Sequence, residues 1–322
     1  MTRLITAAAL MCCVLLTLAV PAAYAQPVDQ AGWAARKRTV ALPNGVRLAY
    51  VELGNPAGRP VLLLHGVTDS SRTWTILAPY LAEYRLLIPD QRGHGASDAP
   101  TCCYGASDFA EDARLFLDAM HVDRAMVVGH SLGSFVAQAL AARHPERVER
   151  LALLASTALA PVKRGDPFWI AVMGMTEPVA GNREFLAGFN IGASPTPVDA
   201  GLVRHAYAEM VAVPLRVWRS VLRELADIQA ARHAADVTAP VLILSGGADP
   251  LFGAEHHRAL IAAYPGATAH VFPELGHNLL VERPVEVGPV LSRFLARGAG
   301  SRGSLGHSSG GLWQIRIGPL SN

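Results

Sequence analysis

The chain has 322 residues, of which 51% are hydrophobic and 17% charged, and its formal net charge at pH 7 is +2. Because the charge is near neutral and the body of the chain has no long acidic or basic run, a polyanionic partner such as nucleic acid is not expected. The length and the apolar fraction predict one domain with a sizeable core and an insertion.

The N-terminus has the pattern of a secretory signal peptide. Arg3 precedes an apolar run over residues 4–20, and the small residues Ala23-Tyr24-Ala25 follow it. We expect cleavage after Ala25 and export to the periplasm or the medium, without stable membrane association of the mature protein. The alternative is an uncleaved membrane anchor, since the run approaches spanning length. Cys12 and Cys13 would be lost with the peptide.

After the signal peptide, predicted strands and helices alternate. Residues 38–42 and 46–53 flank an Asn44-Gly45 turn, which is typical of a β-hairpin. The elements that follow are a buried strand at residues 60–64, a segment with helical spacing at 71–81, a strand at 84–89, a glycine-rich loop at 90–97 and an amphipathic helix at 108–120. This order predicts a parallel sheet covered by helices on both faces.

The centre of the chain carries a G-x-S-x-G sequence, Gly129-His130-Ser131-Leu132-Gly133. An apolar strand precedes it and a helical pattern follows it, which is typical of a nucleophile elbow that exposes the serine hydroxyl at a helix N-terminus. Residues 306–310 match the same pattern but have neither a strand before them nor a helix after them. Ser131 is therefore the candidate nucleophile, in preference to a plain surface serine.

The second half of the chain predicts an interrupted α/β unit. Its elements are a strand at residues 148–155, a helical insertion at 157–236, a strand from residue 240, a helix at 254–264, a strand at 268–272 and a helix at 284–295. The predicted organisation is a signal peptide (1–25), a core in two parts (26–156 and 237–297), a helical cap (157–236) and a disordered tail (298–322).

Five ordered motifs, each after a predicted strand, give residues 38–295 a resemblance to the cap-bearing α/β-hydrolases of the serine-esterase type. The motifs are His65-Gly66, the loop at residues 90–97, the elbow at 129–133, Gly247-Ala248-Asp249 and Gly276-His277. The resemblance implies the α/β-hydrolase fold and a catalytic triad of Ser131, Asp249 and His277. The chemistry needs the same residue types, because a serine hydroxyl requires an imidazole to take its proton and a carboxylate to orient that imidazole.

Other residues compete for the triad roles. Asp90 comes too early in the chain order for the acid, and Glu274 is too near His277. The resemblance implies structural roles for histidines in glycine-bearing loops, here His65 and His94. His130 neighbours the nucleophile, and His256 and His257 lie on a predicted helix and are expected to face solvent.

The resemblance also implies an oxyanion hole made by the backbone N–H groups of Val67 and Leu132. The sequence reads His65-Gly66-Val67 here, without the His-Gly-Gly-Gly run of many lipases and esterases. By that analogy, esters of bulky tertiary alcohols are disfavoured.

The predicted cap is rich in aromatic and methionine side chains, most of which we expect to pack its helices together. The residues assigned to a substrate pocket are His65, Trp74, His130, Trp169, Met173 and Trp218. The other members of the apolar set, without an assigned place, are Phe168, Met175, Phe185, Phe189, Tyr207 and Met210. Open candidates for binding a substrate carboxylate are Arg183, Arg204, Arg216 and Arg219.

Cys102 and Cys103 are adjacent and fit no metal site, which would need more ligands at a longer interval. They are expected to form a vicinal disulfide or to remain two buried thiols. No metal and no organic cofactor is expected.

These patterns together predict an exported serine hydrolase that cleaves a small to medium carboxylic ester or lactone through an acyl-enzyme on Ser131. The expected substrate is an apolar small molecule. Relatives that displace halide or open epoxides use an aspartate at the elbow, so Ser131 argues against both activities. The alternatives are carbon–carbon bond hydrolysis, a cofactor-free perhydrolase or haloperoxidase activity, and a ligand-binding receptor that keeps the fold without turnover.

Overall fold

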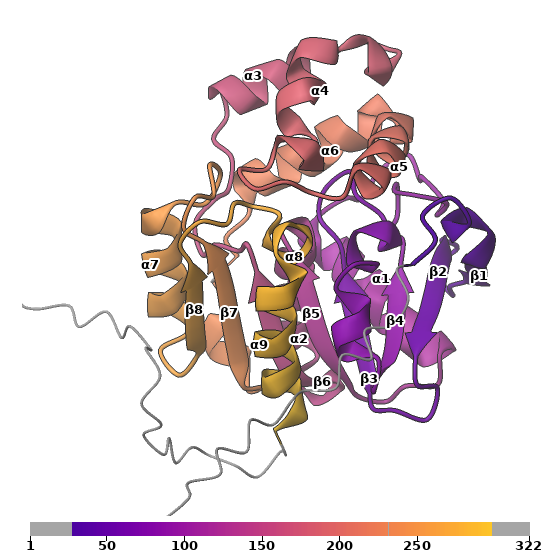
Figure 1. Ribbon diagram of the computed structural model, residues 1–322, viewed down its shortest axis with the longest axis vertical. Helices are drawn as coiled ribbons and strands as arrows, with labels where there is room; N and C mark the ends of the chain where they lie inside the picture. Colours follow the sequence, from indigo (N-terminus) through magenta and orange to yellow (C-terminus); the bar gives the residue numbers. More distant parts are fainter. Residues whose placement is uncertain (1–27, 231, 298–322) are drawn as a thin grey trace, which may run out of the picture.

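The computed structural model describes residues 28–230 and 232–297, whose central element is one eight-stranded sheet (Figure 1). The strand order is β1-β2-β4-β3-β5-β6-β7-β8, with β2 antiparallel to both of its neighbours and the other neighbouring pairs parallel. The strands are β1 (Arg38–Ala41), β2 (Arg47–Gly54), β3 (Pro60–Leu64), β4 (Arg85–Pro89), β5 (Ala125–His130), β6 (Val148–Leu154), β7 (Val241–Gly246) and β8 (Thr268–Phe272). The predicted hairpin and the predicted parallel sheet are confirmed.

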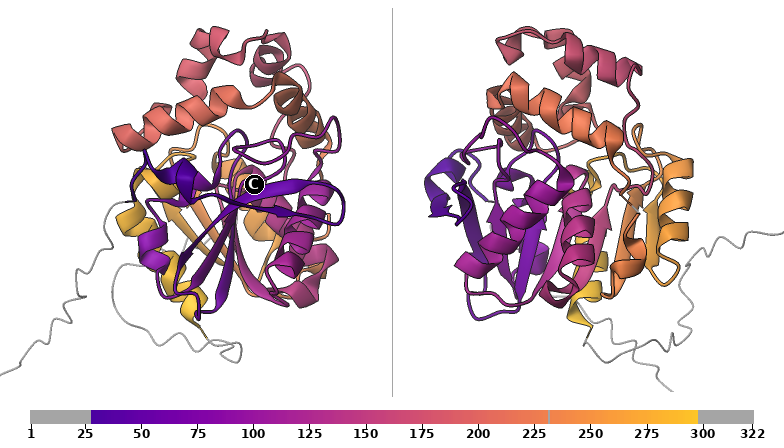
Figure 2. Two further views of the ribbon diagram at one scale, coloured as in Figure 1. Left: turned by 90° about the vertical axis from the view of Figure 1, so that its right-hand side faces the viewer. Right: turned by 180° about the vertical axis from the view of Figure 1, so that it is seen from behind.

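Alternate residues of the central strands enter two separate cores, because successive side chains of a strand point to opposite faces. In β3, Leu62 and Leu64 belong to one core, whereas Val61 and Leu63 belong to the other. The first core lies under α1 (Ala106–Ala119), α2 (Leu132–Arg143) and α7 (Ala254–Ala263), and the second under α8 (Leu279–Glu282) and α9 (Pro284–Ala296). Figure 2 shows α1 and α2 on the face opposite α9. Burial on both faces explains why these strands read as continuous apolar runs.

The segment between β6 and β7 forms a helical insertion, residues 157–236. Its α-helices are α3 (Pro167–Gly174), α4 (Arg183–Phe189), α5 (Ala200–Ala212) and α6 (Leu215–Asp227). They lie together over the carboxyl ends of the parallel strands (Figure 1). Functional loops of open α/β sheets lie at this end, so the insertion covers the place where a site is expected.

Residues 71–81 differ from a continuous helix. They form two short 3₁₀ helices, η2 (Ser71–Trp74) and η3 (Ala78–Leu81). Pro79 stands inside η3 and has no N–H to donate, which opposes a continuous α-helix through this segment. The apolar residues of this segment are nevertheless in the core, since Trp74, Leu77 and Leu81 are fully buried.

Two sequence predictions lie outside the described residues: the signal peptide with Cys12 and Cys13, and the tail from residue 298 with the second G-x-S-x-G match. Export therefore stays a prediction. Over the part of the chain that the structure describes, no helix is both long and apolar enough to cross a membrane.

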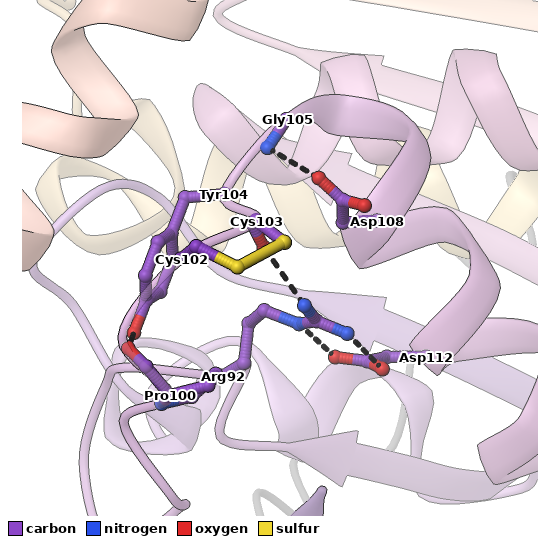
Figure 3. Close-up of a disulfide and its surroundings, with 8 residues drawn as sticks. All are labelled: Arg92, Pro100, Cys102, Cys103, Tyr104, Gly105, Asp108 and Asp112. Atoms are coloured by element: carbon purple, nitrogen blue, oxygen red, sulfur yellow. Dashed lines mark hydrogen bonds and ion pairs between the residues drawn. A yellow bond between two sulfur atoms is a disulfide. The ribbon is translucent and has the colours of Figure 1, made fainter. Parts of the chain in front are cut away.

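Cys102 and Cys103 form a vicinal disulfide next to a buried ion pair (Figure 3). Both cysteines are exposed, so the alternative of two buried thiols is wrong. Arg92 donates to both carboxylate oxygens of Asp112 and to the carbonyl oxygen of Cys103. The pair ties the glycine-rich loop at residues 90–97 to α1.

Replacement of Arg92 by leucine is expected to lower the free energy of unfolding by about 3–5 kcal/mol, because it leaves the Asp112 carboxylate buried without its cation. Arg114→Leu is the matched control. Arg114 pairs with Glu111 and Asp118 on the surface, so its loss is expected to cost no more than about 1 kcal/mol. Urea unfolding of both variants measures the difference, and equal losses would contradict the assignment of a stabilising role to the buried pair.

Candidate active site

Ser131 stands in a sharp turn between β5 and α2. Its φ of 50° and ψ of −118° lie outside the ordinary regions for a residue with a side chain, a strain that marks functional turns. The turn requires its flanking glycines: a Cβ on Gly129 would lie 2.2 Å from the carbonyl oxygen of Gly133, and one on Gly133 would lie 2.1 Å from that of Leu64. This close approach places the serine at the N-terminus of α2.

The structure brings Ser131, His277 and Asp249 together in a hydrogen-bonded line. His277 Nε2 lies 2.9 Å from Ser131 Oγ, and His277 Nδ1 lies 2.9 Å from Asp249 Oδ2. Since an ionised carboxylate only accepts hydrogen bonds, the Nδ1 proton is directed to Asp249 and Nε2 is free to accept the serine proton. The arrangement can therefore generate a serine nucleophile.

The Asp249 carboxylate is fixed by more than the histidine. Its Oδ1 accepts the backbone N–H groups of Leu251 and Phe252 at 2.8 and 3.0 Å. Burial alone would raise the pKa of Asp249, but the hydrogen bond and charge of His277 and the two backbone donors outweigh burial and hold the pKa below its ordinary value. Asp249 is thus ionised at neutral pH.

Glu282, which the sequence analysis did not identify, clamps the loop that carries His277. Its buried carboxylate accepts the N–H groups of Gly276 and Asn278, on either side of the histidine, at 2.9 and 3.1 Å. It also accepts the hydroxyl of Thr196 in the helical insertion at 2.9 Å. A glutamate on a short apolar helix gives no sequence signal for such a role, because its main partners are backbone amides.

Both residues predicted for the oxyanion hole are close to Ser131. Val67 lines the same cavity, in the turn after β3. Leu132 is the first residue of α2, where backbone N–H groups have no partner within the helix. The use of these two N–H groups as an oxyanion hole stays a prediction.

A cavity of about 430 Å³ lies between Ser131 and the helical insertion. Its apolar wall comes from both parts of the chain. The insertion contributes Val162, Phe168, Phe189, Tyr207, Met210 and Leu225, and the core contributes Phe135, Leu251 and Phe252. None of the described residues that line it is a lysine or an arginine. The cavity is thus suited to an uncharged apolar ligand.

Five of the six tentative pocket residues lie outside this lining, and only His130 is part of it. His65 is buried and accepts the N–H of Gln91 at 2.9 Å, and Trp74 is buried in the second core. Trp169 and Met173 pack at the edge of the first core, and Trp218 packs against Phe185 and Phe189 with 3% of its surface exposed. These five assignments were wrong for two reasons. Trp169, Met173 and Trp218 pack the helices of the insertion together, whereas His65 and Trp74 are buried in the α/β core.

The arginine candidates are also placed away from the cavity. Arg219 donates to the carbonyl oxygens of Met173 and Met175, and Arg216 donates to that of Ala99. Arg183 and Arg204 are likewise outside the lining.

The structure corrects one expectation about histidines. His257, expected to face solvent, is buried, and burial lowers its pKa. The described residues contain no group of three or more His, Cys, Asp or Glu side chains that could hold a metal ion.

Asp69 and His130 lie beside Ser131 in the cavity wall. His130 Nε2 is 2.9 Å from the carbonyl oxygen of His277, and burial together with the charge of His277 lowers the pKa of His130 to about 3. Burial raises the pKa of Asp69 to about 7, against the opposing effects of His277, the Gly66 backbone and Thr73. The His130 ring and the Asp69 carboxyl group are therefore both largely uncharged in mildly acidic solution.

Comparison with known proteins agrees with the fold. The family model for the alpha/beta hydrolase fold matches residues 59–284. A 2-hydroxymuconate semialdehyde hydrolase from Pseudomonas sp. (strain CF600) is 29% identical over 269 residues, covering 78% of this chain and 91% of that protein. Among solved structures, a hydrolase from Pseudomonas aeruginosa PA01 has a TM-score of 0.72 at 26% identity, covering 82% of this chain and 100% of the other. An esterase from Rhodococcus sp. ECU1013 has a TM-score of 0.70 at 26% identity, with 81% and 98% covered.

Proposed function

Because this chain belongs to the α/β-hydrolase family, we propose that it is a serine hydrolase that cleaves a small to medium carboxylic ester or lactone through an acyl-enzyme on Ser131. The observation that carries the proposal is the hydrogen-bonded line of Ser131, His277 and Asp249 at the wall of an apolar cavity. The esterase among the similar structures supports the same bond type.

In the proposed reaction, His277 Nε2 takes the proton of Ser131 as Oγ attacks the ester carbonyl carbon. The carbonyl oxygen becomes an oxyanion held by the N–H groups of Val67 and Leu132, and the N-terminus of α2 adds favourable charge. Collapse of this intermediate breaks the bond to the alcohol oxygen, which receives the proton from His277. Water then attacks the acyl-enzyme by the same route and releases the acid, which restores Ser131.

The helical insertion would serve as the cap of this site. It supplies much of the cavity's apolar wall, including Phe168, Phe189 and Tyr207, which would bind the acyl or alcohol part of the substrate. The cavity volume of about 430 Å³ favours a small to medium substrate.

Carbon–carbon bond hydrolysis is the second candidate, because one similar protein is a 2-hydroxymuconate semialdehyde hydrolase. The substrate in that name is a carboxylate. Here the described cavity lining contains no lysine or arginine that could pair with that carboxylate, which disfavours an anionic substrate. This difference makes the neutral ester the better candidate.

The test is a burst experiment with p-nitrophenyl esters of increasing acyl length. We expect a rapid release of about one nitrophenolate per protein followed by slower turnover, with the rate falling once the acyl chain outgrows the cavity. Product from a semialdehyde of the muconate type, without any ester hydrolysis, would support the second candidate instead. Ligand-induced stabilisation without product from either class would indicate a binding protein.

We also propose that the protein is exported after removal of residues 1–25. The proposal rests on the N-terminal pattern and agrees with the vicinal disulfide, since disulfides persist in oxidising compartments. N-terminal sequencing of the protein recovered from its native host should begin at Gln26, and an intact Met1 would refute the cleavage.

A further inference from the structure

Two polar side chains of the cavity wall beside Ser131, Asp69 and His130, have no role in the proposed reaction. Both pack against Gly66: a Cβ on that glycine would lie 2.8 Å from Asp69 Oδ2 and 3.1 Å from His130 Nδ1. Gly66 directly precedes Val67, whose N–H is assigned to the carbonyl oxygen of the substrate. The two side chains therefore lie next to the reacting group and face the same space.

The hydrogen bonds of His130 fix which nitrogen carries its proton. Nε2 lies 2.9 Å from the carbonyl oxygen of His277, and a carbonyl only accepts, so Nε2 holds the proton and donates it. The ring is neutral, as its lowered pKa of about 3 requires. Nδ1 is then a bare acceptor, and no described residue makes a hydrogen bond to it, although the side chain is 99% buried. A buried acceptor of this kind needs a donor from a ligand or from water.

The Asp69 carboxyl group lies close to Nδ1 but is too far away to hydrogen-bond to it. Its Oδ2 lies 3.9 Å from His130 Nδ1, beyond hydrogen-bond distance. A hydroxyl oxygen placed between them can reach both groups: its hydrogen goes to Nδ1, and its lone pair accepts the proton of a neutral Asp69. Water makes the same two hydrogen bonds, so a substrate hydroxyl in this position takes the place of a water molecule.

We propose that Asp69 and His130 form a hydroxyl-binding subsite beside Ser131, so that the preferred substrates are esters with a hydroxyl group close to the ester carbonyl. This inference rests on the proposed ester hydrolysis and names the substrate class within it.

The test compares matched esters that differ by one hydroxyl group: ethyl butyrate with ethyl 2-hydroxybutyrate and ethyl 3-hydroxybutyrate, followed by acid release in a pH-stat. At pH 6 we expect kcat/KM to be at least about tenfold higher for one of the hydroxy esters, the effect of one net hydrogen bond. Asp69→Ala should abolish this preference. Asp69→Asn, whose amide can still donate, should keep it.

The pH dependence separates hydroxyl binding from a structural role of Asp69. Above pH 7 Asp69 is a carboxylate that can only accept, so the one hydrogen of the substrate hydroxyl cannot serve both Asp69 and Nδ1. The hydroxy-ester preference of the wild type should therefore change as the pH rises through about 7, whereas that of Asp69→Asn should stay constant. The titratable groups that face Asp69 are His130, His277 and Glu209. His277 acts as the general base for both esters alike, so its contribution cancels in the ratio.

Asp123→Ala is the control, because it removes the same carboxyl group at an exposed position outside the described cavity lining and should leave the preference unchanged. A wild-type ratio near one, with both esters hydrolysed, would overturn the subsite while the proposed function stands. A preference that survives in Asp69→Ala would overturn it as well.

If none of the three esters is hydrolysed, the proposed function fails, and binding measurements alone then test the subsite. Calorimetry with butanamide and its 2-hydroxy and 3-hydroxy derivatives provides that measurement. Tighter binding of a hydroxy amide to the wild type than to Asp69→Ala supports the subsite, and equal binding overturns it.

Discussion

Ser131→Ala is expected to lower kcat for p-nitrophenyl esters by about 10⁴–10⁶-fold, because the acyl-enzyme cannot form without the serine oxygen. The burst of nitrophenolate should disappear completely. The variant should still fold, because the Ser131 hydroxyl hydrogen-bonds to His277 and alanine fits the space that serine leaves. Thermal unfolding and far-UV circular dichroism of the variant would check this.

Ser107→Ala is the matched control for the nucleophile. Ser107 lies exposed on α1, away from the cavity, so the same loss of a hydroxyl should change kcat by less than twofold or so. If Ser131→Ala kept wild-type turnover and its burst, Ser131 would not be the nucleophile. A folded variant with full loss of turnover and retained ligand binding would support the assignment.

The residues of the hydrogen-bonded line were predictable because each follows a strand of the sheet. The signals for Ser131, Asp249 and His277 are local: an apolar run, a glycine and then the polar side chain. Parallel strands bring their carboxyl ends to one edge, so local signals far apart in sequence converge there. The topology therefore carries most of the information about the candidate triad.

The cavity lining was not predictable, because it depends on how helices of the insertion pack against each other. Trp218 and Phe189 are both aromatic residues of this insertion, yet Trp218 is buried between helices whereas Phe189 also reaches the cavity. Helical periodicity gives the apolar face of α6 but does not say whether a neighbouring helix or a cavity meets it. Asp69 and Glu282 were missed for a different reason: their hydrogen bonds are largely with backbone groups of neighbouring residues, which leave no pattern of side chains in the sequence.

Asp249→Asn is expected to lower kcat by about 10⁴-fold with little change in KM, because it reverses the tautomer of His277. Asp249 Oδ1 accepts the N–H groups of Leu251 and Phe252, so the amide oxygen of asparagine keeps that position and its NH₂ group faces Nδ1. Nδ1 must then accept, and the imidazole proton moves to Nε2, which faces Ser131 and can no longer take the serine proton. KM should be preserved because Asp249 is outside the described cavity lining.

An exposed Asp–His pair, Asp236 and His233, provides a matched control for this prediction. Asp236 Oδ2 lies 3.0 Å from His233 Nδ1, close to the 2.9 Å of the site pair, but both side chains are exposed. Asp236→Asn should therefore leave kcat and KM unchanged, since water can satisfy either tautomer of His233. Steady-state kinetics of the two variants compares the same atomic substitution in a buried and an exposed pair. If Asp249→Asn were as active as Asp236→Asn, the carboxylate would not control His277, and the proton transfer proposed for Ser131 would need another acceptor.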